Sequence, residues 1–307
     1  MRFVYKGQKY KVIQIMEAKM KRIYLIGLLA VLVLVAACGK QNKQETDNHG
    51  AHGGNSQAAS SAGEHGAHGE EHAGETKKLE TNAVWKWSEE TPKSGENTVI
   101  TVQIQDTDGK AIEAFDINHE KKLHLIAVSK DLSFFDHIHP EYKGNGQFEI
   151  TASFPSGGDY KLFADYIPTG GSATTKSEWI KVEGLAAEQV PIKPSDEHSV
   201  ILDGVEITLE NNHSEAGKEI ELNFKLTDAK SKEPITDLEP YLGAVGHVVI
   251  LSEDTEQYLH VHPMEEKAKG PDAKFMTTFP SAGVYKIWGQ FQRNGKTFIS
   301  PFVVEVK

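Results

Sequence analysis

The sequence predicts an all-β protein with two tandem β-sandwich domains. Three observations lead to this prediction: short apolar or alternating runs broken by turn residues, no long helix-period run after the N-terminal region, and three sequence blocks that occur twice. Short strands at such spacing are typical of a sandwich. The length of 307 residues fits two domains, because a domain usually takes about 150 residues.

The N-terminal region is predicted to be a secretory signal. Ile23–Ala37 is an uncharged apolar run, shorter than the roughly 20 residues that span a membrane. It follows Lys19, Lys21 and Arg22 and ends in small residues, as signal peptides do. The closing letters VAAC, which end at Cys38, look like a bacterial lipobox. We therefore expect Cys38 to be lipidated at the extracytoplasmic face of a bacterial membrane; an uncleaved anchor with an incidental cysteine is the other interpretation.

Composition excludes several classes of protein. The net charge is -11, and residues 1–37 carry seven Lys or Arg and one Glu, so the remainder carries -17. Such a chain attracts cations but does not fit a nucleic-acid partner held by phosphate contacts. Cys38 is the only cysteine, which excludes intrachain disulfides, cysteine-rich zinc ribbons and iron–sulfur clusters.

Residues 38–79 are predicted to be a disordered tether. Gly, Ala, Ser, Asn, Gln and Glu dominate, so the segment cannot bury enough apolar surface to offset chain entropy. Imidazole is a common ligand for copper, zinc and nickel, so its histidines could capture metal; a solvated spacer is the alternative. These histidines are His49, His52, His65, His68 and His72.

Strands follow from alternation and turn signals. Glycine-containing turns separate the predicted strands of the first domain. The strands are residues 99–104, 123–129, 147–154, 160–166 and 178–182.

The second half of the chain repeats the first. Residues 123–129 match 246–252, residues 136–140 match 259–263, and residues 154–161 match 279–286. A tandem duplication explains these blocks, and their long period means two domains rather than a solenoid. The predicted boundaries are 1–37 for the signal (with Met16 or Met20 as alternative starts), 38–79 for the tether, 80–184 for the first domain, 185–197 for a linker and 198–307 for the second domain.

Each domain carries three histidines in the pattern H-x12-H-x-H-P. The two histidines of the HxH pair share a strand face, with Cα atoms roughly 6.5–7 Å apart, so both can approach one ion. If the preceding strand pairs antiparallel with this one, the third imidazole lies opposite the pair. The candidate ligands are His124, His137 and His139 in the first domain, and His247, His260 and His262 in the second.

Three histidines with an open position suit copper or zinc. Met264 could add a thioether, which favours Cu(I), but the first domain has Glu141 there. Asp165 could orient an imidazole of its own domain, although its counterpart is Gln290. The competing interpretation is that duplicated histidines are structural and line the end of each sandwich.

Other shared residues indicate structure rather than chemistry. The blocks F-P-S-x-G-x-Y-K resemble a turn followed by a tyrosine corner, built on Tyr160 and Tyr285. The aromatic residues Phe163, Trp179, Trp288 and Phe291 are predicted to lie in the core or on a sheet face. The histidines without a matching copy, His119, His198 and His213, are predicted to lie on surface loops.

The HxHP block followed by F-P-x-x-G-x-Y resembles the YtkA-like family of secreted bacterial proteins, here in tandem over about residues 95–183 and 215–306. The resemblance implies immunoglobulin-like β-sandwich domains, often encoded beside copper-handling proteins. The family pattern covers His137, His139 and Pro140, with His260, His262 and Pro263 as the second copy.

These observations predict an extracytoplasmic, lipid-anchored protein that binds a transition metal, with copper preferred and zinc as the alternative, for buffering, delivery or resistance. The runner-up is a non-catalytic immunoglobulin-like interaction or spacer module with structural histidines. An enzyme is disfavoured, because the two histidine clusters share no carboxylate base and the chain has no nucleophile elbow, phosphate loop or HExxH motif.

Overall fold

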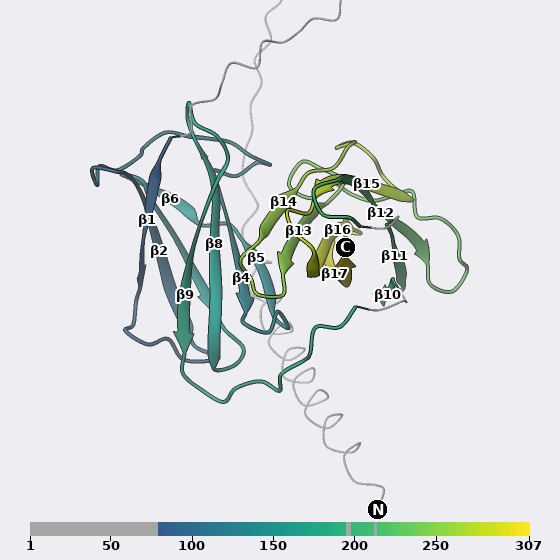
Figure 1. The fold of residues 1–307 in the computed structure, drawn as a ribbon, viewed down its shortest axis with the longest axis horizontal. Coiled ribbons are helices and arrows are strands. Elements are labelled where there is room, and N and C mark those ends of the chain that lie inside the picture. The colour runs from purple at the N-terminus through teal and green to yellow at the C-terminus, as the bar shows by residue number, and fades with distance from the viewer. Residues whose placement is uncertain (1–78, 195–197, 212–213) are drawn as a thin grey trace, which may run out of the picture. The chain divides into compact units, whose positions relative to one another are not determined.

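A computed structural model describes residues 79–194, 198–211 and 214–307 (Figure 1). The named secondary-structure elements of this part are all β-strands, which confirms the all-β prediction. The first domain contains β1 (Thr81–Trp87), β2 (Asn97–Asp106), β3 (Phe115–Asp116), β4 (Leu123–Ser129), β5 (Phe135–Ile138), β6 (Glu141–Gly144), β7 (Gln147–Ser153), β8 (Gly158–Pro168) and β9 (Thr174–Val182). The second contains β10 (Ser199–Leu202), β11 (Val205–Asn211), β12 (Glu219–Asp228), β13 (His247–Ser252), β14 (Tyr258–Val261), β15 (Asp272–Thr278), β16 (Gly283–Arg293) and β17 (Lys296–Val306).

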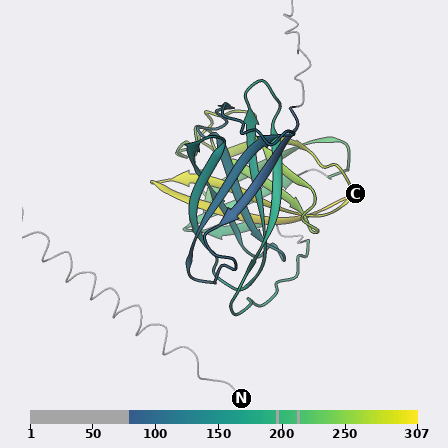
Figure 2. The ribbon, with the colours of Figure 1, turned by 90° about the vertical axis from the view of Figure 1, so that its left-hand side faces the viewer.

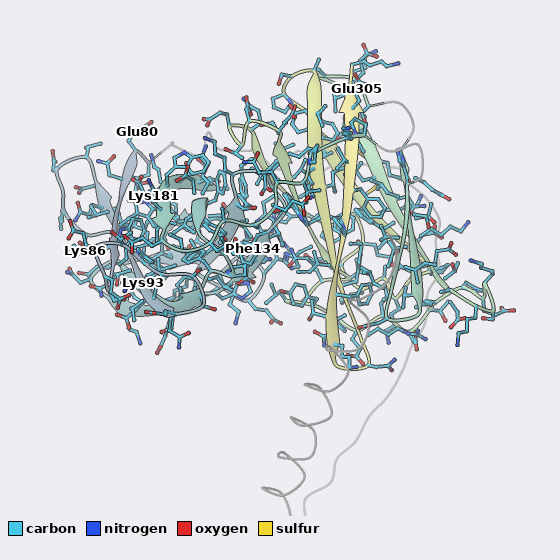
Figure 3. All side chains as sticks on the ribbon, turned by 90° about the horizontal axis from the view of Figure 1, so that it is seen from below. Glu80, Lys86, Lys93, Phe134, Lys181 and Glu305 are labelled. Atoms are coloured by element: carbon cyan, nitrogen blue, oxygen red, sulfur yellow. The ribbon has the colours of Figure 1, made fainter. Side chains whose placement is uncertain are left out.

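The first domain is a sandwich of two antiparallel sheets. One sheet has the order β1-β2-β7-β6, and the other has β3-β8-β4-β5 with β9 beside β8. In Figure 2 the blue strands β1 and β2 lie in front. In β1, Trp85 and Trp87 pack on the core while Lys86 is exposed, so this strand has one solvent face. Figure 3 shows Glu80 and Lys86 on this side of the domain.

The second domain repeats this arrangement. Its sheets have the orders β10-β11-β12-β15 and β14-β13-β16-β17. The strands β13, β14 and β16 correspond to β4, β5 and β8, and they pair with one another in the same way. The two domains are therefore tandem copies of one sandwich, as the repeated blocks predict.

The strand β4 is buried on both faces. Leu123 and Leu125 belong to the core of their own domain. On the opposite face, His124, Ile126 and Val128 are also 0–1% exposed. A strand of an antiparallel sandwich usually leaves one face in solvent, so a second layer must cover this one. The second domain supplies that layer.

An apolar cluster joins the two domains face to face. It contains Ile126 and Val128 from β4 and Val249 and Leu251 from β13. Two aromatic stacks flank it: Phe135 on Trp288 at 4.7 Å and Phe163 on Tyr258 at 5.0 Å between ring centroids. In the sequence repeat Phe135 matches Tyr258 and Phe163 matches Trp288. The interface thus has approximate two-fold symmetry, like the isologous interface of a homodimer.

Two lysines repeat the same symmetry at the edge of this cluster. Lys161 Nζ donates to the carbonyl oxygen of Thr255 at 2.9 Å, and Lys286 Nζ donates to that of Leu132 at 2.7 Å. Lys161 also pairs with Glu256 at 2.8 Å. These bonds fix the register of the two domains, because each donor has one matching acceptor across the interface.

The F-P-S-x-G-x-Y blocks form tyrosine corners. The Tyr160 hydroxyl donates to the Ser156 carbonyl oxygen at 2.9 Å, and Tyr285 bonds Ser281 in the same way at 2.9 Å. Both tyrosines are 1% exposed. The structural interpretation of this motif is confirmed.

Tyr160→Phe is expected to lower the free energy of unfolding by about 1–2 kcal/mol, because it removes two part-buried hydrogen bonds to Ser156 and little packing. Tyr285→Phe should cost a similar amount. Tyr142→Phe is the control, because the Tyr142 hydroxyl bonds Glu113 in an exposed position. Urea denaturation measures all three variants, and equal losses in all of them would contradict the expectation.

The segment predicted as a linker follows the first domain closely. The Gly157 amide donates to the Leu185 carbonyl oxygen at 2.9 Å. The Val190 amide donates to Asp131 Oδ2 at 3.4 Å, and Ile192 packs against the apolar interdomain cluster. Within the described residues, no helix is long and apolar enough to cross a membrane. The predicted signal, Cys38 and the tether histidines lie outside the described residues.

Candidate metal centre

The strand pairing brings the predicted histidines to one end of each hairpin. β4 pairs antiparallel with β5, with Leu125 opposite Ile138. This register sets His124 across from His139, just past the end of β5. β13 and β14 pair with the same register. The antiparallel arrangement expected from the short connection is confirmed.

The three histidines of the first domain converge. Ring nitrogens of His124, His137 and His139 all lie within 4.8 Å of one another. Nδ1 of His124 lies 2.9 Å from Nε2 of His137. Two nitrogens bound to one tetrahedral ion at about 2.0–2.1 Å lie about 3.3 Å apart, so the observed spacing brackets that of a metal site. We call these three residues the inner triad.

The histidines of the second domain are more spread. Nδ1 of His247 lies 3.3 Å from Nε2 of His260, and the rings of His260 and His262 are 5.3 Å apart between centroids. Among the residues that the structure describes, the inner triad is the one group of three His, Cys, Asp or Glu side chains that comes this close together. The two copies of the motif therefore differ in geometry despite their identical spacing.

The two histidine sets form one cluster at the interface. The His260 ring lies 5.2 Å from that of His124 and 6.0 Å from that of His137, and His247 lies 5.9 Å from His137. The sequence did not decide whether the two sets face each other. They do so because both lie on the sheet faces that pack against each other.

His119 lies on a loop, as predicted, but it is half-buried and joins the cluster. Its ring lies 4.6 Å from that of His247 and 4.4 Å from that of His262. The turn before β4 carries it into the interface. Because His119 has no histidine in the second copy, the repeat gave no signal for it. His198 is half-buried outside the cluster, and His213 lies outside the described residues.

Outer hydrogen bonds orient the imidazoles. The ring of His124 donates from Nε2 to the carbonyl oxygen of Asn118 at 2.9 Å. Nδ1 of His137 lies 3.2 Å from Oε1 of Gln290. Histidines that bind metal commonly donate their other ring N–H to a carbonyl or carboxylate in this way.

Asp165 also orients an imidazole, but in the other domain. Its Oδ2 accepts from Nδ1 of His260 at 2.6 Å. The prediction that Asp165 acts within its own domain is therefore wrong. Asp165 and Gln290 are counterparts in the repeat, and each reaches across the interface to the HxH pair of the other domain. The interdomain symmetry decides their partners.

The bond to Asn118 fixes the tautomer of one imidazole. With its proton on Nε2, neutral His124 presents a lone pair at Nδ1. This nitrogen lies 2.9 Å from Nε2 of His137, so it accepts a hydrogen bond when the His137 proton is on Nε2, and both nitrogens are free to bind a cation when that proton is on Nδ1. The pair therefore accommodates either a hydrogen bond or a bound cation.

Protonation of the cluster is unfavourable near neutral pH. Burial, with a contribution from His260, lowers the pKa of His124 to about 3. Burial likewise lowers the pKa of His247 to about 2 and that of His139 to about 4. The pKa of His137 also lies well below 6.5, first because of burial and then because of its histidine neighbours. Neutral imidazoles are the form that binds metal.

Two ring nitrogens are buried without a hydrogen bond. Nε2 of His139 and Nε2 of His247 have no partner among the described residues. A buried, unpaired polar atom costs about 1–3 kcal/mol, so it calls for an explanation such as an ion. Met264, whose thioether the sequence offers as an added ligand, is 55% exposed.

Comparison with known proteins places the chain by family. The family described as "Domain of unknown function (DUF8832)" matches residues 77–184 and again residues 198–307. The tandem organisation is thereby confirmed, whereas the resemblance to YtkA-like proteins stays a prediction. No protein with curated annotation matches the sequence significantly.

Solved structures give only distant similarity. The Escherichia coli adhesin FdeC is 18% identical with a TM-score of 0.26, over 73% of this chain and 64% of that chain. A carbohydrate-binding module of the β-sandwich superfamily is 13% identical with a TM-score of 0.23, over 75% and 97%. A DUF3823 family protein from Bacteroides uniformis is 13% identical with a TM-score of 0.21, over 65% and 94%.

Proposed function

The chain belongs to the family described as domain of unknown function DUF8832, in two copies, and we propose that it binds a transition-metal ion in the interdomain histidine cluster. The inner triad is the proposed binding site. The observation that carries this proposal is the convergence of the inner triad, whose ring nitrogens lie within 4.8 Å of one another.

The donor set favours copper, with zinc as the alternative. All donors are neutral imidazoles, which suit both metals, and Cu²⁺ binds such sites more tightly than the other divalent ions of the first row. In this proposal the ion is cargo that the protein holds and releases for buffering, delivery or resistance. Lipidation of Cys38 would hold the protein at the extracytoplasmic face of the membrane, and the tether histidines would collect ions nearby.

His139→Ala tests the proposal. It is made in the full chain with all five tether histidines replaced by serine, so that metal bound by the tether does not obscure binding by the cluster. We expect His139→Ala to weaken Cu(II) or Zn(II) binding at least 10-fold, because it removes one of three ligands. Its apo-protein melting temperature should stay close to that of the parent, since Nε2 of His139 forms no hydrogen bond with any described residue.

His198→Ala is the matched control, because His198 lies outside the cluster. Each metal is titrated separately, followed by elemental analysis. Unchanged affinity in His139→Ala would contradict the proposed site. A lower melting temperature without metal, together with no metal binding in the parent, would support structural histidines in an interaction module instead.

A further inference from the structure

His119 sits on a strained turn, which needs an explanation. Asn118 and Lys121 exchange backbone hydrogen bonds of 2.8 and 3.0 Å, so His119 and Glu120 are the central residues of a two-residue turn. Both have positive φ, 44° and 65°. Such turns favour asparagine and glycine, and a histidine there costs about 1 kcal/mol.

The equivalent turn of the second domain lies directly opposite. Tyr241 and Ala244 exchange the same pair of backbone bonds around Leu242 and Gly243, which also have positive φ. His119 and Leu242 line the same pocket between the two turns. His119 matches Leu242 in the repeat, so the symmetry of the interface is broken here by one added imidazole.

The His119 ring belongs to a second group of imidazoles. The His119 ring lies between those of His247 and His262, at 4.6 and 4.4 Å between centroids. His247 is 1% exposed, and its Nε2 has no hydrogen-bond partner among the described residues. A buried unpaired nitrogen therefore accompanies two less buried imidazoles. We call His119, His247 and His262 the outer position.

Two of the three residues of the outer position, His119 and His262, border a pocket. This pocket of about 420 Å³ is lined by both turns and reaches His119 and His262, with Glu266 on its wall. A carboxylate beside imidazoles raises the local cation concentration. By contrast, His124 and His137 of the inner triad are only 1% and 7% exposed, whereas His139 is half-buried. Between the two groups lies His260, whose ring is 6.4 Å from that of His119 and 5.2 Å from that of His124.

We propose that the outer position binds a second metal ion and serves as the exchange site through which ions reach the inner triad. This inference rests on the proposed metal-binding function and extends it. An ion enters through the pocket, is held by imidazoles of the outer position, and passes by way of His260 to the buried triad. No bond other than metal–nitrogen coordination forms or breaks in this transfer.

His119→Asn tests the outer position without harming the fold. Asparagine tolerates positive φ, so the metal-free variant should melt at the same or a higher temperature than the parent. In the full chain without tether histidines, elemental analysis after Cu(II) loading should fall from two ions per chain to one. Cu(II) uptake into the remaining site, followed by stopped-flow absorbance, should be slower.

Leu242→Asn is the matched control, because it makes the same change in the equivalent turn but removes no imidazole. It should retain two ions. The proposed second site is contradicted if the parent binds only one metal ion per chain, or if His119→Asn binds as many ions per chain as the parent. A wrong assignment of the inner triad gives a different result: the number of metal ions per chain would then stay unchanged in His139→Ala.

Discussion

Trp288→Ala is expected to lower the free energy of unfolding by about 3–5 kcal/mol, the usual cost of removing a buried tryptophan. Trp288 is 3% exposed and stacks on Phe135 across the interface. Its loss would leave a cavity between the two domains and remove one of the two aromatic stacks. Urea denaturation monitored by circular dichroism measures the change.

The same variant is also expected to weaken metal binding, although Trp288 is not a ligand. Trp288 and Gln290 lie on the same face of β16, and Gln290 contacts His137 of the inner triad. When the domains pack less tightly, Gln290 no longer orients His137, and the ring of His260 no longer lies beside the inner triad. Outer contacts of this kind are worth 10–100-fold in affinity.

Trp179→Ala is the control for both effects. Trp179 is 39% exposed on β9, so its replacement should cost less stability and leave the metal affinity unchanged. Two outcomes would contradict a role of the interface in the metal site. One is an equal loss of stability in Trp288→Ala and Trp179→Ala, and the other is parent-like metal affinity in Trp288→Ala.

Acidification is expected to destabilise the metal-free protein from pH 7.5 to pH 5.5. The pKa of His124 is lowered to about 3 and that of His247 to about 2, and the pKa of His137 lies well below 6.5. In the unfolded chain these groups titrate near 6.5, so below that pH the unfolded state binds more protons than the folded state. Stability is therefore fully present above pH 6.5 and falls as the pH drops toward the folded pKa values.

The expected size follows from the same linkage. Each buried neutral histidine contributes about 1.4 kcal/mol per pH unit below 6.5, so three of them amount to roughly 4 kcal/mol at pH 5.5. This window lies above the usual titration range of carboxylates. His198→Ala should show the parent profile, whereas His124→Leu should lose about one third of the pH dependence, because one of the three histidines is removed. A parent profile that is flat between pH 7.5 and 5.5 would show that the cluster does not stay neutral when folded.

Saturating metal should oppose this loss, because the ion binds the folded cluster and adds stability in proportion to its concentration above the dissociation constant. The protection should itself fade at low pH, where protons compete for the imidazoles. Release of ions on acidification would thus accompany the loss of stability.

The strands were predictable because their signals are local. The runs at residues 123–129 and 160–166 match β4 and the central part of β8, since apolar side chains on both faces indicate a doubly buried strand. The two predicted triads were likewise found by spacing alone, because alternate residues of a strand share a face. His119 gave no such signal, since its position on a turn has no periodicity and no histidine counterpart.

The sequence by itself determined the all-β class, the duplication, the tyrosine corners and the histidine sets of each domain. Only the tertiary structure decided that the two sets form one cluster, that Asp165 orients His260 while Gln290 contacts His137, and that His119 completes a second group of donors. The physical reason is that periodicity specifies the direction of a side chain from its own strand. Which surface it meets depends on the packing of two faces that lie more than 100 residues apart in the chain.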